Sequence, residues 1–287
     1  MVIVYIQELS NLGWNNMKFS EVYLKDLDKR FEHSNARLRI YISERNESVS
    51  LRPGMLVCPG GGYSYCSPRE AEPIAFRFLS EGFNCFILDY TINQPYPAPQ
   101  LDLAFAFNYI REHEKEFDLF ENCLSIIGFS AGGHLVGSYG YTYPELAEKL
   151  GNSREFLRPY SIVMAYPVTL TKGDTHLYTR NVIAAKNPEL EDKMNVVDHI
   201  SKDYPPTFLF TTKDDAVVPY KNTVLMYEAL QKSGVISECH IYESGQHGCS
   251  LVNRSCYQKS DISKKMEEIR DWATLASNFI FNLIDKK

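Results

Sequence analysis

The 287-residue chain lacks any run close to the roughly 20 consecutive apolar residues that a membrane helix needs. It also lacks an excess of basic residues, since 30 Lys and Arg face 36 Asp and Glu and the formal charge is −6. Such a balance offers no basic surface for nucleic acid or anionic lipid, so neither partner is expected. The N-terminus has no basic region and no small-residue cleavage site. We therefore expect no secretory signal and a cytoplasmic location.

Metal and cofactor motifs are missing as well. The seven cysteines contain no CxxC pair, no HExxH motif occurs, and Cys249 and Cys256 beside His247 lack zinc spacing. We therefore expect no metal and no organic cofactor. The odd number of cysteines favours thiols in a reducing compartment, although one or two disulfides stay open.

Apolar segments of strand length alternate with longer amphipathic segments, which is typical of a mostly parallel sheet with helices on both faces. We expect one domain over residues 1–287, with the polar, irregular segment 171–204 as a candidate for a small lid. The expected strands are 38–44, 54–60, 84–91, 123–129, 160–168, 205–212 and 238–244, and the expected helices are about 69–81, 99–116, 131–149, 219–233 and 262–284.

A G-x-S-x-G pentapeptide at 128–132 lies between an expected strand and an expected helix. This context is that of a nucleophile elbow, in which a tight turn exposes a serine hydroxyl and glycines avoid collisions. Ser130 is therefore the candidate nucleophile. The competing interpretation is an ordinary glycine-rich turn, and His134 just inside the helix is expected to be a packing residue.

The sequence PGGGY, with three consecutive glycines, follows the GMLVC part of the expected strand 54–60. Backbone N–H groups of such a loop can stabilise an oxyanion together with the N–H after the nucleophile. The expected donors are Gly61 or Gly62 with Ala131, while Tyr63 and Phe129 are candidate substrate-pocket residues. Packing against the loop is the alternative for Tyr63. A phosphate-binding loop is disfavoured because neither GxGxxG nor GK[ST] is present.

The remaining candidates follow the order Ser, Asp, His that is common in this kind of site. Asp215 follows the strand 205–212 in a D-x-x-V-P pattern and is the candidate acid, with Asp214 as the alternative. His247 follows the strand 238–244 in the loop GQHG and is the candidate general base. The histidines expected at the surface are His33, His113, His176 and His199.

Further short segments carry a family resemblance over about residues 50–284. They are Cys58–Tyr63, Arg69–Glu70, Glu72–Pro73, Gly128–His134, Tyr166–Pro167, Pro205–Phe208, Asp215, Val218–Pro219, Gly245–Gly248 and Trp272. With them the chain resembles the α/β-hydrolase esterase/lipase family, in particular its acetyl-xylan-esterase-like, carboxylesterase branch. The first sixteen residues have no counterpart in it.

The resemblance implies an α/β-hydrolase fold with an eight-stranded, mostly parallel sheet. It also implies hydrolysis of short-chain esters, often acetyl groups on carbohydrates, without a cofactor, and a structural role for Asp102. A formamidase or lactonase uses the same triad and is the main alternative. A peptidase and a non-catalytic binding module are weaker alternatives. The expected partner is a small-molecule or carbohydrate ester, and a homo-oligomer stays open.

Overall fold

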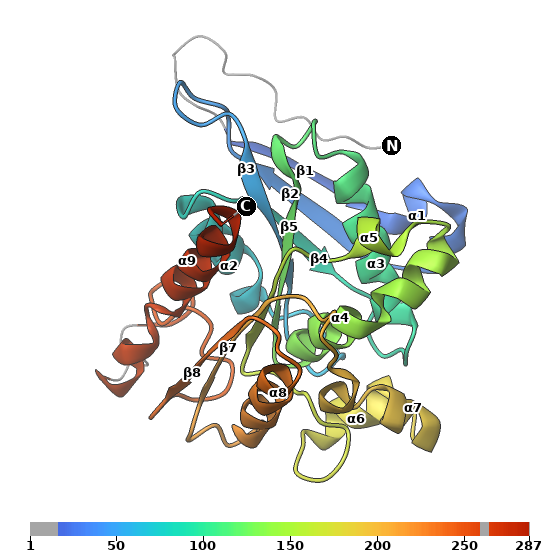
Figure 1. The fold of residues 1–287 in the computed structure, drawn as a ribbon, viewed down its shortest axis with the longest axis vertical. Coiled ribbons are helices and arrows are strands. Elements are labelled where there is room, and N and C mark those ends of the chain that lie inside the picture. The colour runs from blue at the N-terminus through green and yellow to red at the C-terminus, as the bar shows by residue number, and fades with distance from the viewer. Residues whose placement is uncertain (1–16, 259–263, 287) are drawn as a thin grey trace.

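The computed structural model describes residues 17–258 and 264–286, which form one eight-stranded sheet between two layers of helices (Figure 1). The strand order is β1-β2-β4-β3-β5-β6-β7-β8, and all neighbours from β4 to β8 are parallel. This confirms the expected eight-stranded, mostly parallel sheet. The strands are β1 Lys18–Tyr23, β2 Arg37–Ile42, β3 Arg52–Cys58, β4 Asn84–Asp89, β5 Leu119–Phe129, β6 Ile162–Ala165, β7 Thr207–Thr212 and β8 Ser237–Tyr242.

The helices divide between the two faces of the sheet (Figure 1). α2 and α9 share one apolar core with one face, while α3, α4 and α8 share a second core with the other. Every residue of β3, β6 and β7 is buried, as expected of strands covered on both sides. The long helices are α2 Glu72–Ser80, α3 Ala98–Glu112, α4 Ala131–Leu150, α8 Lys221–Lys232 and α9 Trp272–Ile284.

The order of strands changes direction between β3 and β5, which are neighbours in the sheet. After β3 the chain returns through α2 to β4, whereas after β5 it crosses to the opposite face through α4 and reaches β6. The loops after these two neighbouring strands therefore lead to opposite faces of the sheet. In open α/β sheets ligands bind at such switch points.

β1 was not expected from the sequence. Its segment KFSEVY has no buried residue, because it is the edge strand beside β2, so its pattern carries little hydrophobic signal. β5 also begins four residues before the expected start, through three exposed positions. The shorter elements are α1 Leu24–Leu27, η1 Lys29–Phe31, η2 Pro68–Glu70, α5 Arg154–Leu157, α6 Leu177–Ile183, α7 Pro188–Lys193, η3 Val196–His199 and η5 Lys264–Ile269.

Two expectations reach beyond the described part of the chain. The N-terminal segment 1–16, on which the absence of a secretory signal was argued, lies outside the described residues. So do the first two residues of the expected helix 262–284, whose described part is split into η5 and α9. Among the residues that the structure does describe, no helix combines the length and apolarity needed to cross a bilayer.

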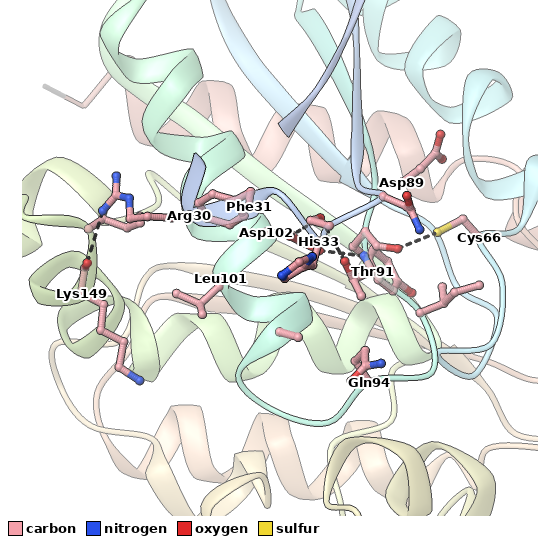
Figure 2. Close-up of a pocket in the computed structure, with 16 residues that line it drawn as sticks. Arg30, Phe31, His33, Cys66, Asp89, Thr91, Gln94, Leu101, Asp102 and Lys149 are labelled. Carbon is pink, nitrogen blue, oxygen red and sulfur yellow. Dashed lines mark hydrogen bonds between the residues drawn. The ribbon is translucent and has the colours of Figure 1, made fainter. Parts of the chain in front are cut away.

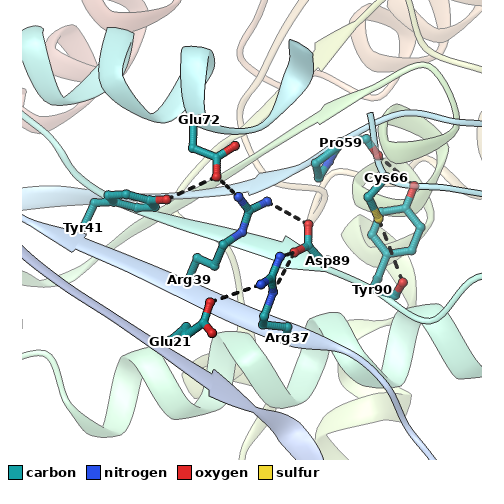
Figure 3. A network of polar contacts seen from close by, with 9 residues as sticks. All are labelled: Glu21, Arg37, Arg39, Tyr41, Pro59, Cys66, Glu72, Asp89 and Tyr90. Atoms are coloured by element: carbon teal, nitrogen blue, oxygen red, sulfur yellow. Dashed lines mark hydrogen bonds and ion pairs between the residues drawn. The ribbon is translucent and has the colours of Figure 1, made fainter. Parts of the chain in front are cut away.

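An ion-pair network attaches the edge strands to the rest of the sheet (Figure 3). Arg37 and Arg39 project from the same side of β2, and both bind the carboxylate of Asp89 at 2.8 Å. Arg37 also pairs with Glu21 of β1 at 3.1 Å, and Arg39 pairs with Glu72 of α2. The side chain of Arg39 is only 9% exposed, so its charge depends on these two carboxylates.

Candidate active site

Ser130 occupies the turn between β5 and α4. Its backbone is left-handed, with φ 52° and ψ −113°, which is strained for a residue with a side chain. A Cβ on Gly128 would lie 2.0 Å from the carbonyl oxygen of Gly132, and one on Gly132 would lie 2.2 Å from that of Cys58. Both positions therefore require glycine, and the turn has the geometry of a nucleophile elbow.

The structure brings Ser130, His247 and Asp215 into one hydrogen-bonded chain. Ser130 Oγ lies 2.8 Å from His247 Nε2, and His247 Nδ1 lies 2.7 Å from Asp215 Oδ2. Because a carboxylate only accepts, Nδ1 carries the proton and Nε2 is free to accept from the serine hydroxyl. This arrangement can draw the proton from Ser130 as the oxygen attacks a carbonyl group.

The two neighbouring aspartates have different partners. Asp215 has a fully buried side chain, and its second oxygen accepts the N–H groups of Val217 and Val218, each at 2.9 Å. Asp214 instead accepts the N–H of Gly245 at 2.6 Å, at the start of the loop that carries His247. Asp215 therefore orients the imidazole, while Asp214 holds the end of its loop.

The glycine loop after β3 runs through left-handed backbone, with φ +130° at Gly61 and +65° at Gly62. Its first amide, that of Gly60, donates to the buried carboxylate of Glu70 at 2.8 Å. Within the described residues, no hydrogen bond engages the N–H of Gly61, Gly62 or Ala131. These are the three amides that the sequence selected as oxyanion donors.

The start of the loop is fixed from the side of β4. The hydroxyl of Tyr90 donates to the carbonyl of Pro59 at 2.7 Å, as Figure 3 shows. Tyr90 directly follows Asp89, the centre of the ion-pair network described above. The network and the glycine loop therefore share one rigid strand end.

The two residues expected to line a substrate pocket, Tyr63 and Phe129, have no exposed surface. Tyr63 has a left-handed backbone, with φ 63°, that turns its ring inward onto His134. Phe129 packs between Tyr166 and Trp272 in the core. Neither ring reaches the open side of the loop.

The segment 171–204 approaches the glycine loop. A Cβ on Gly62 would lie 3.2 Å from Cδ1 of Tyr178 and 3.7 Å from Cε1 of His176. His176 is half-buried, which corrects its expected surface position, and burial together with the charge of His247 lowers its pKa. The sequence gave no signal for this placement, because His176 lies in a polar segment without periodicity. His113 and His199 are likewise half-buried, whereas His33 is exposed.

A separate cavity of about 790 Å³ lies at the carboxyl end of β4 (Figure 2). Phe31, Thr91 and Leu101 are among its lining residues, which include no member of the triad or of the glycine loop. Asp102 lines it too, and accepts hydrogen bonds from the Ser34 hydroxyl at 3.0 Å and from the Thr91 N–H at 2.8 Å. Asp102 thus ties α3 to two loops.

No group of three or more His, Cys, Asp or Glu side chains in the described ranges is arranged to hold a metal ion. No disulfide joins any of the seven cysteines, all of which lie in those ranges. The site that the structure assembles is therefore built from a serine, a histidine, an aspartate and backbone amides.

Comparison with known proteins places this geometry in context. Endo-1,4-beta-xylanase B of Butyrivibrio fibrisolvens is 31% identical over 219 residues, which cover 72% of this chain and 34% of that protein. Acetylxylan esterase of Xylanibacter ruminicola is 27% identical over 199 residues, which cover 66% of this chain and 39% of that protein. The chain thus spans about a third to two fifths of the length of these curated relatives.

A solved structure gives a match along most of both chains. The acetyl ester-xyloside bifunctional hydrolase from Caldicellulosiruptor lactoaceticus superposes with a TM-score of 0.75 at 31% identity, covering 87% of this chain and 88% of that one. The expected α/β-hydrolase fold is confirmed, and these relatives support an ester-bond hydrolase. The model of the BD-FAE family matches residues 38–230. The chain belongs to the BD-FAE family of α/β-hydrolases.

Proposed function

We propose that this protein hydrolyses short-chain carboxylic esters, acetyl esters of carbohydrates in particular, through an acyl-enzyme on Ser130. The observation that carries the proposal is the continuous chain from Ser130 Oγ through His247 to Asp215, with contacts of 2.8 and 2.7 Å. A serine hydroxyl held by a neutral imidazole with a buried carboxylate behind it is an activated nucleophile.

The reaction follows from this geometry. His247 Nε2 takes the proton as Ser130 Oγ attacks the ester carbonyl, and Asp215 stabilises the resulting imidazolium. The N–H groups of Gly61, Gly62 and Ala131 stabilise the oxyanion, and a single such donor is worth about 3–4 kcal/mol. The imidazolium protonates the leaving alcohol. Water, deprotonated by His247, then releases the acid and restores Ser130.

Two exposed aromatic rings support a carbohydrate as the alcohol moiety. Tyr65 is 57% exposed and Tyr178 is 48% exposed, and both rings border the glycine loop. They come from segments far apart in the sequence and flank Gly61 and Gly62. Exposed aromatic faces of this kind can pack against the C–H face of a sugar ring. The names of the relatives, acetylxylan esterase and endo-xylanase among them, agree with this substrate class.

The approach of the segment 171–204 to the glycine loop supports short acyl groups. Tyr178 and His176 lie directly over Gly62, which limits the space beside the oxyanion donors. Each methylene that finds a fitting apolar pocket favours binding by roughly 0.8 kcal/mol, but one that meets a wall weakens it. We propose that this segment acts as a small lid over the substrate.

The test combines labelling with a substrate series. A fluorophosphonate probe is expected to label Ser130 in the native protein, and Ser130→Ala is expected to abolish both labelling and ester turnover while the fold persists. Specificity constants for p-nitrophenyl acetate, butyrate, octanoate and decanoate are expected to peak at two to four carbons. Acetylated xylo-oligosaccharides, formamides, lactones and peptides complete the panel.

Three outcomes contradict the proposal. Full turnover in Ser130→Ala rules out the nucleophile, and a maximum at eight or more carbons rules out the short-chain preference. If the specificity constant for a formamide or a lactone exceeds that for every ester, the protein is a formamidase or a lactonase that uses the same triad.

A further inference from the structure

A second buried carboxylate lies beside the triad. Glu70, at the end of η2, is 4% exposed and is not used by the mechanism above. Its Oε2 accepts the N–H of Gly60 at 2.8 Å, and its Oε1 accepts the hydroxyl of Tyr166 at 2.7 Å. Hydrogen bonds to an ionised acceptor are stronger than neutral ones, so this carboxylate is a firm anchor for both groups.

One carboxylate oxygen of Glu70, Oε2, holds the glycine loop against the nucleophile. A Cβ on Gly60 would lie 2.6 Å from Glu70 Oε2 and 3.1 Å from the Cβ of Ser130. The carboxylate therefore lies directly behind the elbow. Because the amide of Gly60 is committed to Glu70, the direction of the following backbone, and so of the Gly61 and Gly62 amides, depends on this contact.

The other oxygen, Oε1, is linked to the histidine loop through Tyr166. Tyr166, at the end of β6, is 1% exposed, and its hydroxyl also accepts the N–H of Ser250 at 3.1 Å. Its ring stands edge-on to the imidazole of His247, with centroids 5.3 Å apart. Tyr166 thus connects Glu70 to a position three residues after His247.

The charge of Glu70 also acts on His247. Burial raises the pKa of Glu70, while the Tyr166 and Gly60 hydrogen bonds and the positive charges of His247 and Arg69 oppose that rise. The ionisable groups near the imidazole or near its carboxylate neighbours come from five segments. They are Asp215, Glu70 with Arg69, Tyr166, His176, and Cys249 on the same loop as His247.

We propose that Glu70 is a positioning residue that holds the oxyanion loop and the histidine loop in one geometry and whose negative charge supports the imidazolium of His247. This inference rests on the proposed function for its kinetic consequence. Its electrostatic part, the effect of the Glu70 charge on His247, does not depend on the proposed function.

Glu70→Gln is the decisive variant, because the amide oxygen can still accept the Gly60 N–H but carries no charge. Loss of a nearby negative charge destabilises the imidazolium. We therefore expect the acidic limb of kcat/KM for p-nitrophenyl acetate to move to lower pH. We expect kcat to drop about ten- to hundredfold, as for loss of a hydrogen bond to a charged group.

Two further variants separate the effect of the Glu70 charge from the effect of its hydrogen-bonded link to the histidine loop. Tyr166→Phe keeps the charge of Glu70 but cuts the link to Ser250, so kcat should fall while the acidic limb stays close to its native position. Glu72→Gln, two residues along, removes a carboxylate that pairs with Arg39 instead. It should leave the acidic limb unchanged.

An unchanged acidic limb in Glu70→Gln, with kcat within twofold of the native value, overturns the proposal. If Glu70→Gln does not fold, Tyr166→Phe decides, and native kcat in that folded variant also overturns it. Failure of the proposed function appears elsewhere, as turnover in Ser130→Ala or as no ester turnover in the native protein.

Discussion

Tyr63 donates its phenolic proton to Nδ1 of His134 across 2.9 Å, and neither side chain has any exposed surface. The other ring nitrogen of His134 faces the carbonyl oxygen of Met194 at 2.9 Å. Because a carbonyl only accepts, Nε2 carries the proton and Nδ1 accepts. One neutral imidazole therefore joins the oxyanion loop, the helix after the nucleophile and the segment 171–204.

This contact predicts a pH-dependent stability. Burial lowers the pKa of His134 from 6.5 to about 4, so the unfolded chain binds a proton that the folded protein refuses. The stabilisation is complete above pH 6.5 and is lost as pH falls toward 4, by about 3 kcal/mol. Urea unfolding at several pH values should show this loss. In His134→Gln the loss of unfolding free energy between pH 6.5 and 4 should be smaller by that amount, and an equal loss in both proteins contradicts the prediction.

The pair of aspartates after β7 predicts unequal effects of two similar substitutions. In Asp215→Asn the amide oxygen stays with the Val217 and Val218 N–H groups, so an NH2 donor faces His247 Nδ1 and favours the wrong tautomer. We therefore expect kcat to fall by about 10⁴-fold. Asp214→Asn retains an oxygen that can accept the Gly245 N–H and should reduce kcat far less. Steady-state kinetics on p-nitrophenyl acetate compares them. The opposite ranking would show that Asp214 orients the histidine in solution.

The elbow predicts that a single methyl group is disruptive at Gly132. An added Cβ would lie 2.2 Å from the carbonyl oxygen of Cys58 and 2.5 Å from that of Pro59. Gly132→Ala should therefore lower the free energy of unfolding by about 1–3 kcal/mol and abolish turnover, because the oxyanion loop must move.

Gly234→Ala is the matched control. It has a left-handed φ of +71° and open space around it, so it should cost about 1–2 kcal/mol but leave kcat unchanged. A Gly132→Ala protein with native turnover would show that the loop and the elbow can separate.

The exposed ring of Tyr178 predicts a change in selectivity for the alcohol part of the ester. Tyr178→Ala should raise KM for acetylated xylo-oligosaccharides about three- to tenfold, the equivalent of one aromatic contact, and leave ethyl acetate turnover unchanged. Tyr23→Ala removes a tyrosine of β1 that is 38% exposed and serves as control. Equal losses on both substrates would mean that Tyr178 supports the loop instead of the sugar.

Local chemistry explains what the sequence determined. The elbow around Ser130 depends on glycines within two residues and on a strand and a helix at its sides, so it can be read from five letters in context. The central strands are apolar on both faces and are equally plain. The loops of His247 and Asp215 follow such strands. Parallel strands bring their carboxyl ends to one edge, and that placed both loops near the serine.

The tertiary structure decided everything that depends on direction or distant contact. Asp215 differs from its neighbour only in which way a short loop turns after β7. Tyr63 points into the core because its left-handed backbone reverses the expected side. His176 and Glu70 reach the site from segments whose patterns carry no catalytic signal, and β1 pairs with β2 although it has no buried residue. Such placements arise from the packing of segments far apart in the chain, which no local spacing of residues records.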